Sequence, residues 1–204
     1  MPYSFEMTSD ILEIGTPHFV PEIATDTFRK LYTAEILTDA ELMALPRQIE
    51  ISMHGATPVA PDFINAAGPT VVSERVAKTI RALEPDLHRL MPLEVVWRAT
   101  GMSCGTYVFV LVTETVEHFD YDRTAWLTKT DGGFGRTAAE ASQYRLALGY
   151  NEPCVLRAGA IAGRHVWRGA PEGTRKIYFC SDAFRDAARI EEWRGARFIE
   201  VGVV

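Results

Sequence analysis

The chain has 204 residues, of which 47% are hydrophobic and 24% charged, so it can bury one substantial core and is not disordered throughout. It shows neither the basic stretch and apolar run of a secretory signal nor an apolar run of about 18 residues, which predicts a cytoplasmic protein without a membrane anchor. The three cysteines, Cys104, Cys154 and Cys180, are widely spaced and form no Cys-x-x-Cys pair. Reduced thiols and no structural metal are therefore expected.

The net charge of −6 is concentrated near the amino terminus. Residues 1–65 hold ten acidic and three basic residues, a net charge of −7, whereas the rest of the chain carries a net charge of +1. This excess argues against nucleic acid as a ligand of the segment and favours a basic protein partner, with a solvated acidic face as the alternative. Glu35, Asp39 and Glu41 are the predicted partner-binding residues, because no base between Lys30 and Arg47 neutralises them.

Two short helices and a strand are expected in the first third of the chain. Apolar residues from Phe28 to Glu35 follow helical spacing, and Thr38 opens a second helix that ends before Pro46. Residues 47–53 alternate apolar and polar side chains, which predicts a half-buried strand.

Residues 55–69 are rich in Gly, Pro and Ala and form the expected boundary between two parts of the chain. We therefore predict an acidic N-terminal extension over residues 1–60. The main domain is expected over residues 61–204.

One order of signals occurs twice in the predicted main domain: an apolar strand, Ser followed by an acid, an amphipathic helix, a break and another apolar strand. The copies span residues 70–97 and 177–201. In the pairs Ser73-Glu74 and Ser181-Asp182, the hydroxyl can accept a hydrogen bond from the first helical turn, and the carboxylate favours the positive end of the helix dipole. Each copy therefore predicts a unit of strand, capped helix and strand.

Strands outnumber helices between the two units. This order favours an α+β fold with a mainly antiparallel sheet and a few packed helices. The expected strands are residues 107–112, 115–121, 153–157 and 163–168, with a glycine-rich loop at 131–135 and a helix at 137–148.

A possible hydrolase site begins with Gly101-Met102-Ser103-Cys104-Gly105, which matches the G-x-S-x-G pattern. A nucleophile elbow requires a helix directly after the serine, and its serine requires an acid and a histidine, for which Asp120 and His165 are candidates. A β-rich stretch follows instead, so the pattern is better explained as a loop between strands. A small hydrolase using Ser103 remains an alternative.

A possible metal site is His118-Phe119-Asp120-Tyr121-Asp122, where alternation would place His118, Asp120 and Asp122 on one face of a strand. The same spacing is typical of a strand that runs into a solvated turn. The turn is the favoured interpretation, and a metal-dependent enzyme is the alternative.

Several short motifs together resemble an immunity-protein family of bacterial polymorphic toxin systems, formerly a domain of unknown function. The resemblance covers about residues 60–204, with Trp167 where the family pattern usually has Phe. Its residues are Pro61-Asp62-Phe63, Val72-Ser73-Glu74-Arg75, Leu93-Glu94-Val95, Phe119-Asp120, His165-Val166-Trp167-Arg168, Ile177–Asp182 and Gly195–Phe198. Within these motifs, we expect structural roles for Asp62, Ser73, Glu74, Asp120, Trp167, Arg168, Ser181 and Asp182.

The resemblance implies a protein that binds and neutralises a cognate toxin in the cytoplasm without catalysing a reaction. From the residues themselves we expect no cofactor, no metal, and neither nucleic acid nor membrane as a partner. The acidic first third suggests that the toxin is basic. A regulatory binding protein unconnected with toxins is a further alternative.

Overall fold

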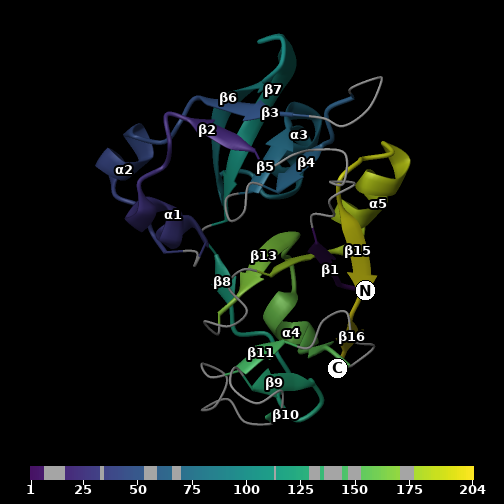
Figure 1. Ribbon diagram of the computed structural model, residues 1–204. Coiled ribbons are helices and arrows are strands. Elements are labelled where there is room, and N and C mark those ends of the chain that lie inside the picture. Colours follow the sequence, from purple (N-terminus) through teal and green to yellow (C-terminus); the bar gives the residue numbers. More distant parts are fainter. Residues whose placement is uncertain are drawn as a thin grey trace.

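The computed structural model describes residues 1–6, 17–32, 35–52, 59–65, 70–112, 114–128, 134–135, 144–146, 153–170 and 177–204. Within this part of the chain, strands contribute more residues than helices, and most strand pairs are antiparallel (Figure 1). The predicted α+β class is confirmed.

The larger sheet has six strands in the order β2-β3-β6-β7-β5-β4. Only the pair β3–β6 is parallel, and a register shift between Val95 and Val96 interrupts β6–β7. Helix α3 (Glu74–Leu83) follows β5 and buries Val76, Ala77 and Ile80. The strands are β2 (His18–Val20), β3 (Gln48–Ile51), β4 (Phe63–Asn65), β5 (Thr70–Ser73), β6 (Arg89–Trp97) and β7 (Ser103–Leu111).

The second sheet has five strands in the order β15-β1-β14-β13-β8. Helix α5 (Asp182–Ile190) follows β14 and buries Phe184 and Ala188. The strands are β1 (Tyr3–Glu6), β8 (Thr115–Val116), β13 (Val166–Gly169), β14 (Tyr178–Cys180) and β15 (Arg197–Glu200).

The two predicted strand, helix, strand units are confirmed as β5-α3-β6 and β14-α5-β15. In each unit, a third strand lies between the other two and is antiparallel to both. It is β7 in the first unit and β1, from the opposite end of the chain, in the second. The units therefore share a sheet topology as well as an order of signals.

A shared core joins the two units. Phe63 of β4 lies 6.0 Å from Phe5 of β1 and 6.0 Å from Trp193, measured between ring centroids, and Phe184 of α5 lies 5.3 Å from Trp193. Residues of α3 and α5 belong to the same buried cluster. Aromatic burial on this scale dominates core energetics, so the units stabilise each other.

A polar link also joins the first unit to the five-stranded sheet at the end of α3. The buried Glu84 carboxylate accepts hydrogen bonds from the backbone N–H groups of His165 (2.6 Å) and Val166 (2.9 Å). Its Oε2 also lies 2.9 Å from His88 Nε2. The carboxylate therefore fixes the end of α3 against the start of β13.

Several smaller elements complete the described structure. Helices α1 (Thr25–Tyr32) and α2 (Asp39–Met43) lie beside the larger sheet on the left in Figure 1. The others are α4 (Ala158–Ile161), β9 (Trp126–Thr128), β10 (Phe134–Gly135), β11 (Tyr144–Leu146), β12 (Val155–Leu156) and β16 (Gly202–Val203).

Two local predictions between the units are wrong. Tyr144–Leu146, inside the helix predicted over 137–148, pair with β9 as a strand, and the rest of that helix lies outside the described residues. Residues 115–121 do not form one long strand, because β8 ends at Val116 and the backbone turns after Asp120. Residues 131–133 of the predicted loop lie outside the described residues.

The predicted division near residue 60 stays a prediction. Strand β3, which precedes this boundary, pairs with β6, and β1 pairs with β14 and β15. The predicted N-terminal extension thus contributes strands to both large sheets.

Candidate functional site

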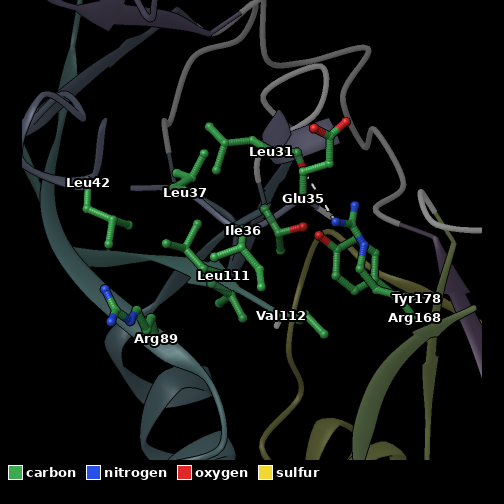
Figure 2. A pocket seen from close by; sticks show the side chains of 12 residues that line it. Leu31, Glu35, Ile36, Leu37, Leu42, Arg89, Leu111, Val112, Arg168 and Tyr178 are labelled. Carbon is green, nitrogen blue, oxygen red and sulfur yellow. Dashed lines mark hydrogen bonds between the residues drawn. The ribbon is translucent and has the colours of Figure 1, made fainter. Parts of the chain in front are cut away.

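A cavity of about 270 Å³ lies where α1 and α2 meet the ends of the two large sheets (Figure 2). Its wall is mainly apolar, with Arg89 at one end and Arg168 and Tyr178 at the other. The apolar side chains come from α1, α2, residues 36–37 and the end of β7, and they include Leu31, Ile36, Leu37, Leu42, Leu111 and Val112. A cavity of this kind, with a few polar groups in an apolar wall, is typical of a binding site.

Arg168 of β13 fixes one end of the cavity. Its side chain is buried, with the residue 3% exposed, and its Nη1 donates a hydrogen bond to the Leu31 backbone oxygen at 3.1 Å. Its guanidinium also lies over the ring of Tyr178, 4.6 Å from the ring centroid. These contacts tie α1 to the five-stranded sheet.

Thr70 places a buried hydroxyl in the cavity wall. It is the first residue of β5 and is 3% exposed, and its Oγ1 has no hydrogen-bond partner in the described structure. A buried hydroxyl without a partner costs about 1–3 kcal/mol. This hydroxyl is therefore available to a group that enters the cavity.

The three predicted partner-binding carboxylates lie on the segment beside the cavity. Glu35 lines the cavity and pairs with Arg29 of α1. Asp39, whose side chain is 94% exposed, lies 3.8 Å from Arg89 of β6. The sequence argument that no base neutralises these groups is wrong, because the neutralising bases come from α1 and from another strand.

Glu41 has a clear structural role. Its Oε2 accepts a hydrogen bond from Thr38 N at 2.8 Å, while its own N–H donates to Thr38 Oγ1 at 3.2 Å, so the two residues form a capping box on α2. Its Oε1 accepts a hydrogen bond from Lys30 Nζ at 2.6 Å. The bond from Lys30, followed by those from Thr38, lowers the pKa of Glu41 to about 2.

Asp62 is the centre of the best-connected polar network among the predicted motif residues. Its buried carboxylate accepts hydrogen bonds from Ser73 Oγ (2.6 Å), Arg75 Nε (2.6 Å) and the Arg194 backbone N–H (2.9 Å). Burial opposes its ionisation, but the bonds from Arg75, Ser73 and Arg194 outweigh burial and lower the pKa of Asp62. Asp62 therefore links the first unit to the end of α5.

Gly195 lies at the same junction. Its φ of +91° favours glycine, and a Cβ atom at this position would lie 2.6 Å from the Phe63 backbone oxygen. Phe63 N in turn donates to the Arg194 oxygen at 3.1 Å. The motifs around Asp62, Ser73 and Gly195 thus form one structural joint.

The two predicted N-caps differ. Ser181 accepts a hydrogen bond from Phe184 N at 3.4 Å, as expected, and its Oγ lies 2.8 Å from His165 Nδ1. Ser73 occupies the N-cap position of α3 but makes no capping hydrogen bond, since its hydroxyl donates to Asp62. The predicted cap at Ser73 is therefore wrong.

The remaining motif residues also have partners within the protein. Glu74 pairs with Arg81, and Asp182 pairs with the ammonium group of Met1. Trp167 is buried, and its ring stacks on Phe179 at 6.1 Å.

The residues considered for hydrolysis do not form a site. Ser103 opens β7 and is exposed, and a strand follows it rather than a helix. Asp120 Oδ1 accepts hydrogen bonds from Asp122 N and Arg123 N, both at 3.1 Å, which is the geometry of a turn. His165 Nδ1 contacts Ser181 rather than Ser103.

The suggested metal cluster is not assembled either. His118 is fully buried, its Nδ1 lies 2.7 Å from the Val116 backbone oxygen, and its ring contacts Phe119 and Phe179. Burial is the main reason why its pKa is lowered to about 4. No group of three possible metal ligands occurs within the described ranges.

Comparison with known families decides the assignment. The family model of the immunity protein family Imm11 matches residues 4–203. The chain belongs to the Imm11 immunity protein family. The match extends the resemblance, which covers about residues 60–204, to nearly the whole chain. No curated protein matches the chain.

No described helix of this Imm11 member combines the length and apolar character needed to span a membrane. The cavity was missed by sequence reasoning. Its wall residues run from Leu31 to Tyr178, and no local pattern links them. Two wall residues were singled out from the sequence: Glu35 as a partner-binding carboxylate and Arg168 as a motif residue with an expected structural role.

Proposed function

We propose that the protein binds and neutralises a cognate toxin inside the cell that produces it. The observation that carries this proposal is the family match over residues 4–203. The toxin is the product of the neighbouring gene, and neutralisation occurs by covering its active site or by blocking a movement that it needs. The protein itself catalyses no reaction, a proposal supported by the internal partners of Asp120, His118 and His165.

The segment of residues 35–43 is the proposed contact surface. Ile36 and Met43 are 87% and 79% exposed, although both are large and apolar. Exposed apolar side chains next to polar ones are typical of a surface that a protein partner covers.

The partner is proposed to be basic because residues 1–65 carry a net charge of −7. The ion pairs of Glu35 and Glu41 reduce the local field, so Asp39 is the carboxylate of this segment best placed to attract a basic group. Apolar contact is therefore expected to contribute more affinity than charge at this surface.

Co-purification tests the proposal. The full chain is expressed with the catalytically inactivated C-terminal domain of the toxin encoded beside its gene. We expect a stable complex on size-exclusion chromatography, and titration calorimetry then gives its stoichiometry and affinity. Failure of the two folded proteins to associate at micromolar concentrations would contradict the proposal.

A further inference from the structure

The cavity of Figure 2 has the properties of a pocket for a single side chain. Its volume is about 270 Å³, and a protein cavity of roughly 150 Å³ already holds a benzene molecule. One aromatic or large aliphatic side chain therefore fits. The apolar wall provides the burial that makes such a residue an interface anchor.

The polar groups of the wall indicate what else the occupant must offer. Thr70 Oγ1 is buried and has no hydrogen-bond partner in the described ranges, so its proton can be donated to an incoming acceptor. The phenol of Tyr178 also lines the cavity. A peptide chain fits these groups because every apolar side chain carries a backbone carbonyl, an acceptor, a few ångströms away.

The rim favours a protein over a small molecule. Ile36 lines the cavity and yet is 87% exposed, so an occupant that stayed inside the cavity would leave this side chain in water. Asp39 lies on the same segment, and although Arg89 lies 3.8 Å away, its side chain is 94% exposed and can also approach a basic residue beside the anchor. The net charge of residues 1–65, −7, favours a partner of the same basic character.

We propose that this cavity receives one large apolar side chain of the toxin, whose backbone carbonyl accepts a hydrogen bond from Thr70. A basic residue next to this anchor lies near Asp39. The inference rests on the proposed function, since the occupant is the toxin. It adds the position of the contact and the chemistry of the residue that makes it.

Two variants of the full chain test the pocket. Thr70→Val removes the hydroxyl with little change in shape, and Ile36→Ala removes exposed apolar surface at the rim. The matched controls are Thr106→Val on the exposed part of β7 and Ile190→Ala at the end of α5, where the isoleucine is 74% exposed. Binding of the inactivated toxin domain is measured by calorimetry, and thermal melting is recorded for each protein.

We expect each test variant to raise the Kd at least fivefold and each control to change it less than twofold. The melting temperature of Thr70→Val should equal or exceed that of the wild type, because a buried hydroxyl without a partner is lost. If both folded test variants bound the toxin with wild-type affinity, the proposal that a toxin side chain occupies the cavity would be overturned, but the proposed function would not. A small molecule retained in the cavity, seen by native mass spectrometry together with unchanged toxin binding, would also overturn it. A wild-type chain that fails to bind the toxin would overturn both proposals.

Discussion

Replacing Asp62 with Asn tests the joint between the two units. The amide has nearly the same shape as the carboxylate but carries no charge, and only one of its two polar atoms accepts hydrogen bonds. The Arg194 N–H and one Arg75 nitrogen both contact Oδ2, so an amide nitrogen on that side would face two donors. Rotating the amide would place its nitrogen against Arg75 Nε, which can only donate, whereas the Ser73 hydroxyl could turn to accept a hydrogen bond from it.

The expected loss follows from these contacts. A buried N–H without an acceptor costs about 1–3 kcal/mol, and hydrogen bonds that lose their charged partner weaken by roughly 1 kcal/mol each. The Arg75 side chain is half exposed and can turn to water, which limits its contribution to the loss of stability. We therefore expect the free energy of unfolding of Asp62→Asn to fall by about 3 kcal/mol, and Tm by about 6–12 °C for a chain of this size.

Urea unfolding and thermal melts measure the loss, with Asp122→Asn as the control because the Asp122 side chain lies on an exposed turn. The control should change the stability by less than about 0.5 kcal/mol. If Asp62→Asn melted within 2 °C of the wild type, in the same experiment that gave a normal control, the network would not hold the units together. Toxin binding by the folded fraction should be unchanged, since Asp62 lies away from the cavity lining.

Three further predictions address single residues. Because burial lowers the pKa of His118 from 6.5 to about 4, its neutral form contributes stability that is present above pH 6.5 and lost as the pH falls toward 4. Urea unfolding should therefore show that the free energy of unfolding falls between pH 6.5 and 4 by up to about 3 kcal/mol less in His118→Phe than in the wild type. The same pH dependence in both proteins would contradict a buried neutral ring. Thermal melts should show that the free energy of unfolding falls by about 1 kcal/mol in Ser181→Ala and by about 2 kcal/mol in Ser73→Ala, because the Ser73 hydroxyl bonds to a carboxylate. Weaker toxin binding without a change in melting temperature would instead assign that serine to the interface. Stopped-flow mixing should show that Asp39→Lys slows association with the toxin about threefold at low salt and little at 0.5 M salt. An association rate equal to that of the wild type at both salt concentrations would show that Asp39 does not attract the toxin.

The two units were predictable because their signals are local. Capping serines, helical apolar stripes and β-branched runs are read within about 15 residues, and Ser181 caps its helix as expected. The insertion of β1 and β7 between the strands of each unit was not predictable in the same way. Tertiary packing decides which strands become neighbours, and it produces no pattern of residues at a fixed spacing in the sequence.

The candidate site was less accessible to sequence reasoning for the same reason. The bond from Ser73 to Asp62 exists because β4 pairs with β5 and brings position 62 next to position 73, and this contact displaces the expected cap. The bases that neutralise Glu35, Asp39 and Glu41 come from other elements, so counting charges along the segment overstated its field. The family resemblance was correct but too short, since conspicuous motifs are concentrated after residue 60 while the match begins at residue 4.

Neutralisation of the toxin in living cells is the most direct test of the proposed function. The active toxin domain encoded beside the gene is induced in a heterologous host, with and without the full chain, and surviving colonies are counted at matched expression of both proteins. We predict that the chain restores colony numbers to those of a host carrying inactivated toxin, and that Ile190→Ala restores them equally. Killing that continues while the chain is soluble, folded and present in excess over the toxin would contradict its function as the immunity protein of that toxin.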